Sequence, residues 1–370
     1  MKVLLCTPYK DNPDIVRGGI NQWGQNILSY FKTHNEEVEI IPVSFDRHVS
    51  RIYYDTIFQR LNNGIREHYG PIKTALKIIK KEAPDVIHIC TSAGTGSIGA
   101  YILLKYAKRH NVKSVIHLHF GRLPELATKR NWEWKMLKLL LDLCDIIVPM
   151  NRPSEYSLYN LGYTNVKYLP NPLNIDFINS LIQDNTIERR SRQILYVGHV
   201  YKSKGVVELV KGCKNIEGVR LRIVGKCIGD IKNELINVGT KEGAADWIEF
   251  VGEISHTEVI EEFLKADLFV FPSYTEGFPN VILEAMACGC PIISSSVGAI
   301  PEMLDIEGTP CGLCIQPHSS KEVHEAVVSL INDQEKKNMY SERAKLRVNS
   351  LYTLPVVCEQ LLEIWKTSLS

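Results

Sequence analysis

The chain has 370 residues, of which 45% are hydrophobic and 23% are charged, and its net charge is +1. This length predicts two domains, and the composition is typical of a soluble globular protein. The apolar runs are too short for a membrane-spanning helix or a secretory signal. The ten cysteines follow no disulfide-framework spacing, so we expect a reduced, cytoplasmic setting.

Short apolar runs alternate with segments of helical periodicity along almost the whole chain. In the first half we expect strands at 2–6, 38–43, 85–90, 113–119, 145–150 and 166–169, and helices at 20–33, 54–68, 71–82, 97–110, 131–143 and 153–161. In the second half we expect strands at 193–198, 219–225, 247–251, 267–272, 291–294 and 313–316, and helices at 205–215, 230–241, 256–265, 280–288, 319–333, 335–349 and 355–366. Repeated units of this kind predict an α/β protein with doubly wound parallel sheets.

The segment LPNP at 169–172 is the clearest boundary between two such sheets, since two prolines interrupt the pattern. The polar, charge-rich segment 174–192 that follows is typical of an inter-domain linker. We therefore expect one domain over 1–172 and a second over 190–350. A helical tail at about 353–370 ends the chain.

The most informative stretch begins at Glu276, directly after the apolar strand expected at 267–272. A loop leads into a helix that Asn280 can cap, and Glu284 lies in the first turns of that helix. The unpaired N–H groups at a helix start favour an anion, and the two carboxylates can accept hydrogen bonds from sugar hydroxyls. This combination suits a nucleotide sugar. The candidate donor-binding residues here are Gly277, Phe278, Pro279, Asn280, Val281 and Glu284.

This stretch resembles the signature of retaining glycosyltransferases of family 4, which have the GT-B fold, and their E-x7-E motif is matched by Glu276 and Glu284. The resemblance implies two Rossmann-like domains that face a deep cleft, with the donor bound by the second domain and the last helix crossing back onto the first. It also implies that Glu284 holds the ribose, and that Glu276 and the backbone of 277–281 hold the transferred sugar and its phosphate.

The segment GHVYKSKG at 198–205 follows an expected strand and opens a helix, a position suited to phosphate binding. It resembles the family's GR-x4-KG segment, in which an Arg and a Lys hold the donor diphosphate. Here His199 stands where Arg is usual, so Lys204 is expected to be the main cation, with Lys202 as a substitute. The alternative is that Lys204 is a solvated lysine near a helix start.

Gly18 and Gly19 precede the first expected helix, after the first strand. Two glycines there allow a phosphate or sugar to approach the backbone closely, and in the family this loop lies against the donor. The alternative is an ordinary flexible turn.

His117 and His119 share one face of the strand expected at 113–119, and His119 lies at its carboxyl end. His119 resembles the family histidine that contacts the transferred sugar, so we assign it with Glu276 to the catalytic group. His117 is deeper in the strand and is expected to be a core histidine. No acidic residue accompanies the pair, which argues against a metal site.

Three other features have structural interpretations. The glycines at 94, 96 and 99 form a G-x-G-x-x-G pattern, but the acid that NAD binding requires about 20 residues later is missing. The Cys pairs at 288/290 and 311/314 lack a second ligand pair at a zinc-like spacing. No DxD-type pair stands beside the diphosphate elements, so we predict transfer without a metal or other cofactor.

Charge is distributed unevenly between the two halves. Residues 1–171 carry 23 Lys and Arg against 15 Asp and Glu, whereas the remaining 199 carry 20 against 27. A basic first half can face a lipid-linked phosphate or an anionic inner leaflet, or it can simply dock on the acidic half. The apolar helix at 131–143, with Trp132 and nearby lysines, is expected in the core or, alternatively, at a membrane surface.

We therefore predict a cytoplasmic, retaining, metal-independent glycosyltransferase that uses a nucleotide-diphosphate sugar, with UDP-hexose or UDP-N-acetylhexosamine favoured. Its acceptor would be a glycan or an anionic lipid-linked molecule in surface polysaccharide assembly, and no nucleic acid is expected as a partner. The alternatives are a GT-B nucleotide-sugar epimerase, a non-catalytic sugar-nucleotide-binding protein and an NAD-dependent enzyme.

Overall fold

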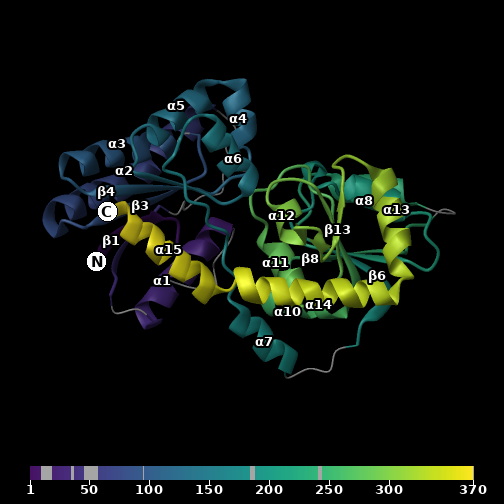
Figure 1. Ribbon diagram of the computed structural model, residues 1–370. Coiled ribbons are helices and arrows are strands. Elements are labelled where there is room, and N and C mark those ends of the chain that lie inside the picture. Colours follow the sequence, from purple (N-terminus) through teal and green to yellow (C-terminus); the bar gives the residue numbers. More distant parts are fainter. Residues whose placement is uncertain are drawn as a thin grey trace. The chain divides into compact units, whose positions relative to one another are not determined.

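The computed structural model describes residues 1–9, 19–34, 37–45, 57–94, 96–183, 188–240 and 244–369. The chain divides into two compact units (Figure 1). The first unit contains Met1–Pro172 together with Leu354–Ser370, and the second contains Leu173–Thr353. No helix in the described ranges is long and apolar enough to cross a membrane.

The first unit is built on a parallel sheet in the order β2-β1-β3-β4-β5. Its strands are β1 (Lys2–Thr7), β2 (Glu39–Ser44), β3 (Val86–Thr91), β4 (Lys113–Leu118) and β5 (Ile146–Pro149). Its helices are α1 (Gly19–His34), α2 (Ile57–Glu82), α3 (Gly96–Arg109), α4 (Leu123–Lys129), α5 (Trp132–Leu141), α6 (Arg152–Asn160) and α15 (Leu354–Leu369).

Successive side chains on the strands of this sheet point to opposite faces, and they form two separate hydrophobic cores. In β1, Leu4 and Cys6 face the core formed with α2, α3, α4 and α5, whereas Val3 and Leu5 face the core formed with α1 and α15. The sheet is therefore covered on both faces, as a doubly wound sheet requires. The last helix, α15, packs beside α1 in this second core (Figure 1).

The second unit is built on a parallel sheet in the order β13-β10-β9-β6-β7-β8. Its strands are β6 (Arg190–Val197), β7 (Arg220–Val224), β8 (Ile248–Gly252), β9 (Ala266–Phe271), β10 (Ile292–Ser295) and β13 (Leu313–Ile315), and a small hairpin pairs β11 (Asp305–Ile306) with β12 (Thr309–Pro310). Its helices are α7 (Ile175–Gln183), the 3-10 turn η3 (Lys202–Lys204), α8 (Val206–Cys213), α9 (Ile231–Gly239), α10 (His256–Lys265), α11 (Asn280–Ala287), α12 (Ile300–Leu304), α13 (Ser320–Ile331) and α14 (Gln334–Leu351). The predicted α/β class with two doubly wound parallel sheets is thus confirmed.

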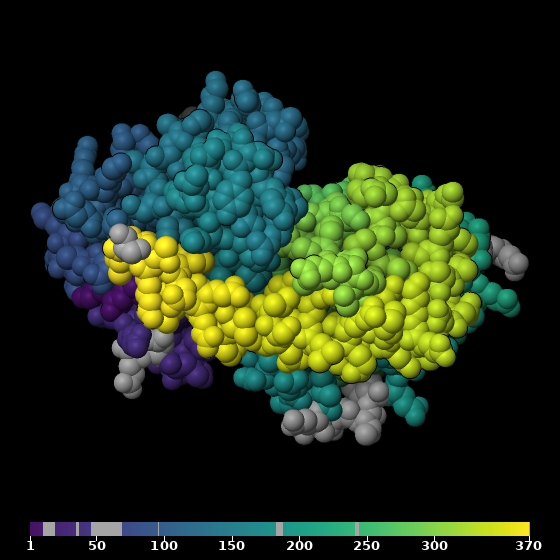
Figure 2. Space-filling model, viewed as in Figure 1, coloured from purple at the N-terminus to yellow at the C-terminus, as the bar shows by residue number. Residues whose placement is uncertain are grey.

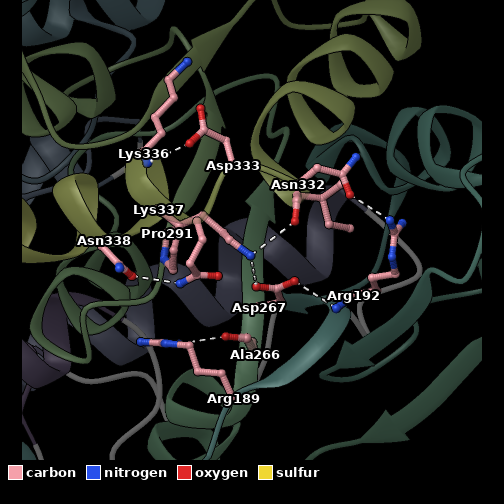
Figure 3. Close-up of polar contacts among 12 residues, drawn as sticks. Arg189, Arg192, Ala266, Asp267, Pro291, Asn332, Asp333, Lys336, Lys337 and Asn338 are labelled. Atoms are coloured by element: carbon pink, nitrogen blue, oxygen red, sulfur yellow. Dashed lines mark hydrogen bonds and ion pairs between the residues drawn. The ribbon is translucent and has the colours of Figure 1, made fainter.

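A buried ion pair anchors the start of β9, the strand that leads to Glu276. Lys337 of α14 donates to Asp267 at 2.6 Å, and both side chains are 7% exposed (Figure 3). The second carboxylate oxygen of Asp267 accepts from the backbone N–H of Arg192 at 2.8 Å. The outer side of α14 lies on the surface of the second unit (Figure 2). Asp267 therefore joins α14 and β6 to β9 through one carboxylate.

Three predictions about secondary structure were wrong. Segment 166–169 forms only a bridge between Val166 and Ile147, because the next rung would need an N–H from Pro149, which has none. The two helices expected at 54–68 and 71–82 are one helix, α2, which continues through Pro71. The expected linker 174–192 contains α7 and the start of β6. Helices α4 and α12 and the β11–β12 hairpin were not predicted.

Candidate functional site

Two loops meet at the carboxyl ends of the neighbouring strands β6 and β9. Adjacent parallel strands end at the same edge of a sheet, so the segments that follow them lie together. Gly205 has a φ of +70°, and a Cβ there would lie 1.9 Å from the carbonyl oxygen of Pro272. The backbone N–H of Tyr274 also donates to the carbonyl of Ser203 at 3.0 Å. Glycine at 205 therefore permits close contact between the two backbones.

This contact brings Lys204 and Glu276 together. The ammonium Nζ of Lys204 lies 2.5 Å from Oε1 of Glu276, and the side chains are only 20% and 12% exposed. The same ammonium lies 5.6 Å from the centre of the Phe271 ring. The pair is thus a charge-assisted hydrogen bond in a mostly buried setting. Lys204 and Glu276 were both predicted to hold the donor, and although they are 72 positions apart in the sequence they are direct neighbours.

The carbonyl end of Glu276 is held by the backbone that follows β10. Gly298 has a φ of +57°, and a Cβ there would lie 2.2 Å from the Glu276 carbonyl oxygen. The N–H of Ala299 donates to the carbonyl of Gly277 at 3.0 Å. Because backbone from two strand ends packs without intervening side chains, the Glu276 loop has a defined position.

The loop then enters α11, where the predicted cap residue was wrong. Pro279 occupies the cap position with extended backbone, and Asn280 is already the first helical residue, so Asn280 does not cap the helix. Phe278 is buried and packs edge-on against the ring of Tyr352, with centroids 5.5 Å apart. Val281 is half-buried in the first turn. The N-terminal end of α11 therefore begins directly beyond the Glu276 loop.

Glu284, in the middle of α11, has a partner that sequence reasoning missed. Its Oε1 lies 3.0 Å from Nε2 of His256, the first residue of α10. The ring of His256 stacks on Phe177 of α7, with centroids 5.2 Å apart and planes at 15°. The hydrogen bond to Glu284 raises the pKa of His256 above 6.5, although burial opposes the shift. The available signal was Ser255 and Glu258, which form a capping box that fixes the start of α10.

The remaining residues of the phosphate segment differ in their surroundings. His199 is exposed, and its carbonyl accepts a hydrogen bond from the hydroxyl of Tyr196 at 2.9 Å. Lys202, the predicted substitute for the missing arginine, forms an ion pair with Glu234 of α9 at 2.9 Å. Lys202 therefore points to α9, and Lys204 is the lysine of η3 that contacts Glu276.

The other candidate residues lie in the first unit. His119 follows β4 directly, is 8% exposed and packs against Trp23 and His117, with centroid distances of 5.0 and 4.0 Å. Burial lowers the pKa of His119 to about 3, so its imidazole is neutral. Gly19 is the first residue of α1, and a Cβ there would meet nothing within 4 Å. Gly18 lies outside the described residues.

The G-x-G-x-x-G pattern has a packing explanation at its last position. A Cβ at Gly99 of α3 would lie 2.9 Å from the Ile72 side chain of α2. This glycine lets the two helices α2 and α3 approach closely.

The comparisons with known proteins agree with these observations. A model of the glycosyl transferases group 1 matches residues 177–347, and a model of glycosyltransferase family 4 matches residues 17–177. An uncharacterised glycosyltransferase of Methanocaldococcus jannaschii is 26% identical over 93% of this chain and 92% of its own. The capsular polysaccharide biosynthesis glycosyltransferase CapM of Staphylococcus aureus is 24% identical over 81% of this chain and 82% of its own.

Two solved structures share the fold over almost the whole chain. HepE of Anabaena in complex with UDP has a TM-score of 0.72 at 17% identity and covers 99% of this chain and 100% of its own. Sucrose-phosphate synthase of Thermosynechococcus elongatus has a TM-score of 0.76 at 16% identity and covers 99% and 98%. The two family models together with the parallel α/β units identify the protein: it belongs to glycosyltransferase family 4 and is a glycosyltransferase with the GT-B fold.

Proposed function

We propose that the protein is a retaining glycosyltransferase that moves a hexose or N-acetylhexosamine from a UDP-sugar to a glycan or lipid-linked acceptor in surface polysaccharide assembly. The observation that carries this proposal is the contact between Lys204 and Glu276 beside the start of α11. It places a cation, a carboxylate and helix N–H groups at one strand edge. CapM acts in capsular polysaccharide biosynthesis, and a HepE structure contains UDP-glucose, which supports the choice of donor and pathway class.

Each part of the nucleotide sugar then has a matching partner in the protein. An ammonium has three N–H donors, so Lys204 can hold Glu276 and a diphosphate oxygen at the same time. The amides of 277–281 at the start of α11 favour the phosphate, and Glu276 accepts hydrogen bonds from the sugar hydroxyls. Glu284 accepts from the ribose hydroxyls. His119, as a neutral imidazole, contacts the transferred sugar.

The reaction requires no side-chain nucleophile. The bond between the anomeric carbon and the diphosphate oxygen breaks, and its electron pair stays on the leaving phosphate. The acceptor hydroxyl oxygen bonds to the anomeric carbon on the same face, and its proton passes to the leaving phosphate oxygen. Negative charge therefore grows on the diphosphate, where Lys204 and the α11 amides stabilise it more strongly than in the ground state.

Charge stabilisation by Lys204 and by helix N–H groups makes a divalent metal unnecessary in this proposal. Activity should therefore persist in EDTA. A complete loss in EDTA that Mg²⁺ or Mn²⁺ reverses would contradict metal independence without contradicting the transferase assignment.

The first unit offers a surface for an anionic acceptor in the cytoplasm or at the inner leaflet. On α5, Trp132 and Leu139 are 59% and 44% exposed, and Lys135 lies on the same exposed side of the helix. Exposed apolar and basic side chains together favour an anionic lipid surface. Sedimentation with vesicles that contain anionic lipid, compared with neutral vesicles, tests this association.

The donor assignment is tested by nucleotide binding. A stabilising shift of the melting temperature with UDP, and a smaller one with GDP and ADP, is expected because a ligand stabilises the state that it binds. Lys204→Ala removes a charge-assisted hydrogen bond of about 1.5–3 kcal/mol, so UDP binding should weaken about 10- to 150-fold. Lys202→Ala is the matched control on the same turn and should leave the affinity unchanged. Equal effects of the two variants would remove Lys204 from the donor site.

The catalytic assignment is tested separately. Glu276→Gln should abolish transfer while UDP affinity changes little, because the carboxylate contacts the sugar. Unchanged turnover would exclude that role. Turnover of the UDP-sugar to an isomer without any acceptor would favour an epimerase, and UDP-sugar binding without turnover would favour a non-catalytic protein.

A further inference from the structure

A buried chain of nitrogen-containing rings lies beneath His119 in the first unit. Trp365 of α15, His88 of β3 and His117 of β4 are all 0% exposed. The indole Nε1 of Trp365 lies 3.0 Å from His88 Nδ1, and His88 Nε2 lies 3.3 Å from His117 Nδ1. The His117 ring in turn packs against the His119 ring at 4.0 Å. The chain therefore joins the last helix to the candidate catalytic histidine.

The direction of donation along this chain is fixed at its first member. An indole N–H can only donate, so His88 Nδ1 must be the acceptor and carries no proton. A neutral imidazole then has its proton on Nε2, which donates to His117 Nδ1. By the same rule His117 carries its own proton on Nε2. One tryptophan thus sets the tautomer of two histidines.

His88, His117 and His119 are all neutral in the folded protein. Burial lowers the pKa of His88 to about 3, with a further contribution from His119, and burial lowers the pKa of His117 well below 6.5. Among the described residues, Nε2 of His117 and Nε2 of His119 have no hydrogen-bond partner. The neutral His119 ring is held between His117 and Trp23, and a rotation of the His117 ring would change the surface against which it packs.

A metal site is the competing interpretation of the same atoms. The ligand atoms of His88, Cys90 and His117 lie within 4.8 Å of one another. A metal on His88 Nδ1 would displace the N–H of Trp365. A metal on His88 Nε2 would move the imidazole proton to Nδ1 and set it against the same N–H. Burial also raises the pKa of the Cys90 thiol to about 12, although a hydrogen bond with Thr7 opposes the shift. The tautomer chain is therefore the arrangement in which the N–H groups of Trp365 and His88 both have an acceptor.

We propose that Trp365 and His88 are positioning residues for glycosyl transfer, which act by fixing the tautomer and ring orientation of His117 and so the position of His119. This inference rests on the proposed function, since it assumes that His119 contacts the transferred sugar. If the His117 proton were on Nδ1, it would lie against the N–H of His88, and the His117 ring would have to rotate to remove this clash. A misplacement of about 1 Å at a reacting centre can cost about 100-fold in rate.

The test compares two conservative changes at buried tryptophans of the same unit. Trp365→Phe keeps a ring in the core but removes the donor to His88, whereas Trp134→Phe makes the same change on α5, in the core on the opposite face of the sheet. Both should lower the melting temperature. Only Trp365→Phe should lower kcat, by about 10-fold or more, with the KM for the donor within about twofold. Equal kcat values for the two variants would overturn the proposal.

Substitutions at His88 separate hydrogen bonding from packing. The side-chain amide of Gln can still donate to His117 and accept from Trp365, so His88→Gln should keep kcat within about threefold of the wild type. Leu can do neither, so His88→Leu should lower kcat about as much as Trp365→Phe. Leu and Gln variants with the same kcat would contradict a role for the hydrogen bond.

The tautomers themselves can be measured on the wild-type protein, independently of activity. Long-range 1H–15N spectra of the histidine side chains should show His88 and His117 with protonated Nε2. A proton on Nδ1 of His88, or a stoichiometric transition metal in the purified protein, would overturn the proposal. If the wild type transfers no sugar, the proposed function fails, while these spectra still decide whether the chain of tautomers exists.

Discussion

Acid should destabilise the first unit strongly, because His88, His117 and His119 are neutral and buried. In the folded protein the pKa of His88 and that of His119 are about 3, and that of His117 is also far below 6.5. In the unfolded chain each ring takes up a proton as the pH falls through about 6.5. The unfolded state then binds more protons than the folded state, so the free energy of unfolding falls as the pH falls.

The size of this effect follows from the same values. Between pH 7 and pH 5, one histidine that protonates only on unfolding removes about 2 kcal/mol. The three rings together remove about 6 kcal/mol, which is comparable with the whole stability of a typical domain, about 5–15 kcal/mol. Paired carboxylates contribute mainly at lower pH, so this interval isolates the histidines.

Urea unfolding at pH 7, 6 and 5 measures the loss. Fluorescence is a suitable probe, since Trp23 packs against the ring of His88 at 5.6 Å. His88→Gln removes one titrating group, so the decrease between pH 7 and pH 5 should be smaller by about 2 kcal/mol than in the wild type. An unfolding free energy of the first unit that does not change over this interval would refute the neutral, buried state of these histidines.

Three further predictions concern the second unit. The hydrogen bond to Glu284 raises the pKa of His256, so the contribution of His256 to stability is complete below about pH 6.5 and is lost as the pH rises through the raised pKa. His256→Gln should remove this part of the pH dependence, measured by urea unfolding between pH 6 and pH 9. Lys337→Ala leaves the Asp267 carboxylate buried without its ion-pair partner and should lower the free energy of unfolding by about 3–5 kcal/mol. The double variant with Met at 337 and Leu at 267 should recover most of this loss. Equal losses for the single and the double variant would show that packing dominates. Gly298→Ala places a Cβ against the Glu276 loop at a φ of +57° and should therefore weaken UDP binding. Calorimetry measures the affinity, and an unchanged affinity would contradict this prediction.

Local patterns predicted the elements that carry the Glu276 loop. The apolar run at 267–272 and the helix at 280–288 differ by a residue or less from β9 and α11, because burial of a parallel strand and the first turn of a helix leave marks on neighbouring residues. The exact cap was missed for a local reason as well. Asn280 is a good cap residue by type, but Pro279 already has the extended backbone that the cap position needs.

Elements defined by partners elsewhere in the chain were harder to predict. Helix α7 lies in the segment that the sequence pattern indicates as a linker, because the charged residues after it obscure an amphipathic segment of nine residues. Its role becomes clear only when Phe177 is seen to stack on His256, a residue of α10. Likewise, segment 166–169 has the composition of a strand, and only the position of Pro149 on its neighbour stops the ladder.

The histidines on β4 show why a candidate site can be predicted while its support cannot. Alternation along the strand places His117 and His119 on one face, and it correctly indicates that His117 is the deeper of the two. It does not indicate that His88, 29 positions earlier, supplies a hydrogen bond, or that Trp365, 277 positions after His88, sets its direction. A buried imidazole needs one donor and one acceptor, and only the return of α15 to this sheet shows which nitrogen has which role. If His119 contacts the sugar, α15 helps to position that histidine through Trp365, and truncation before Trp365 should lower turnover.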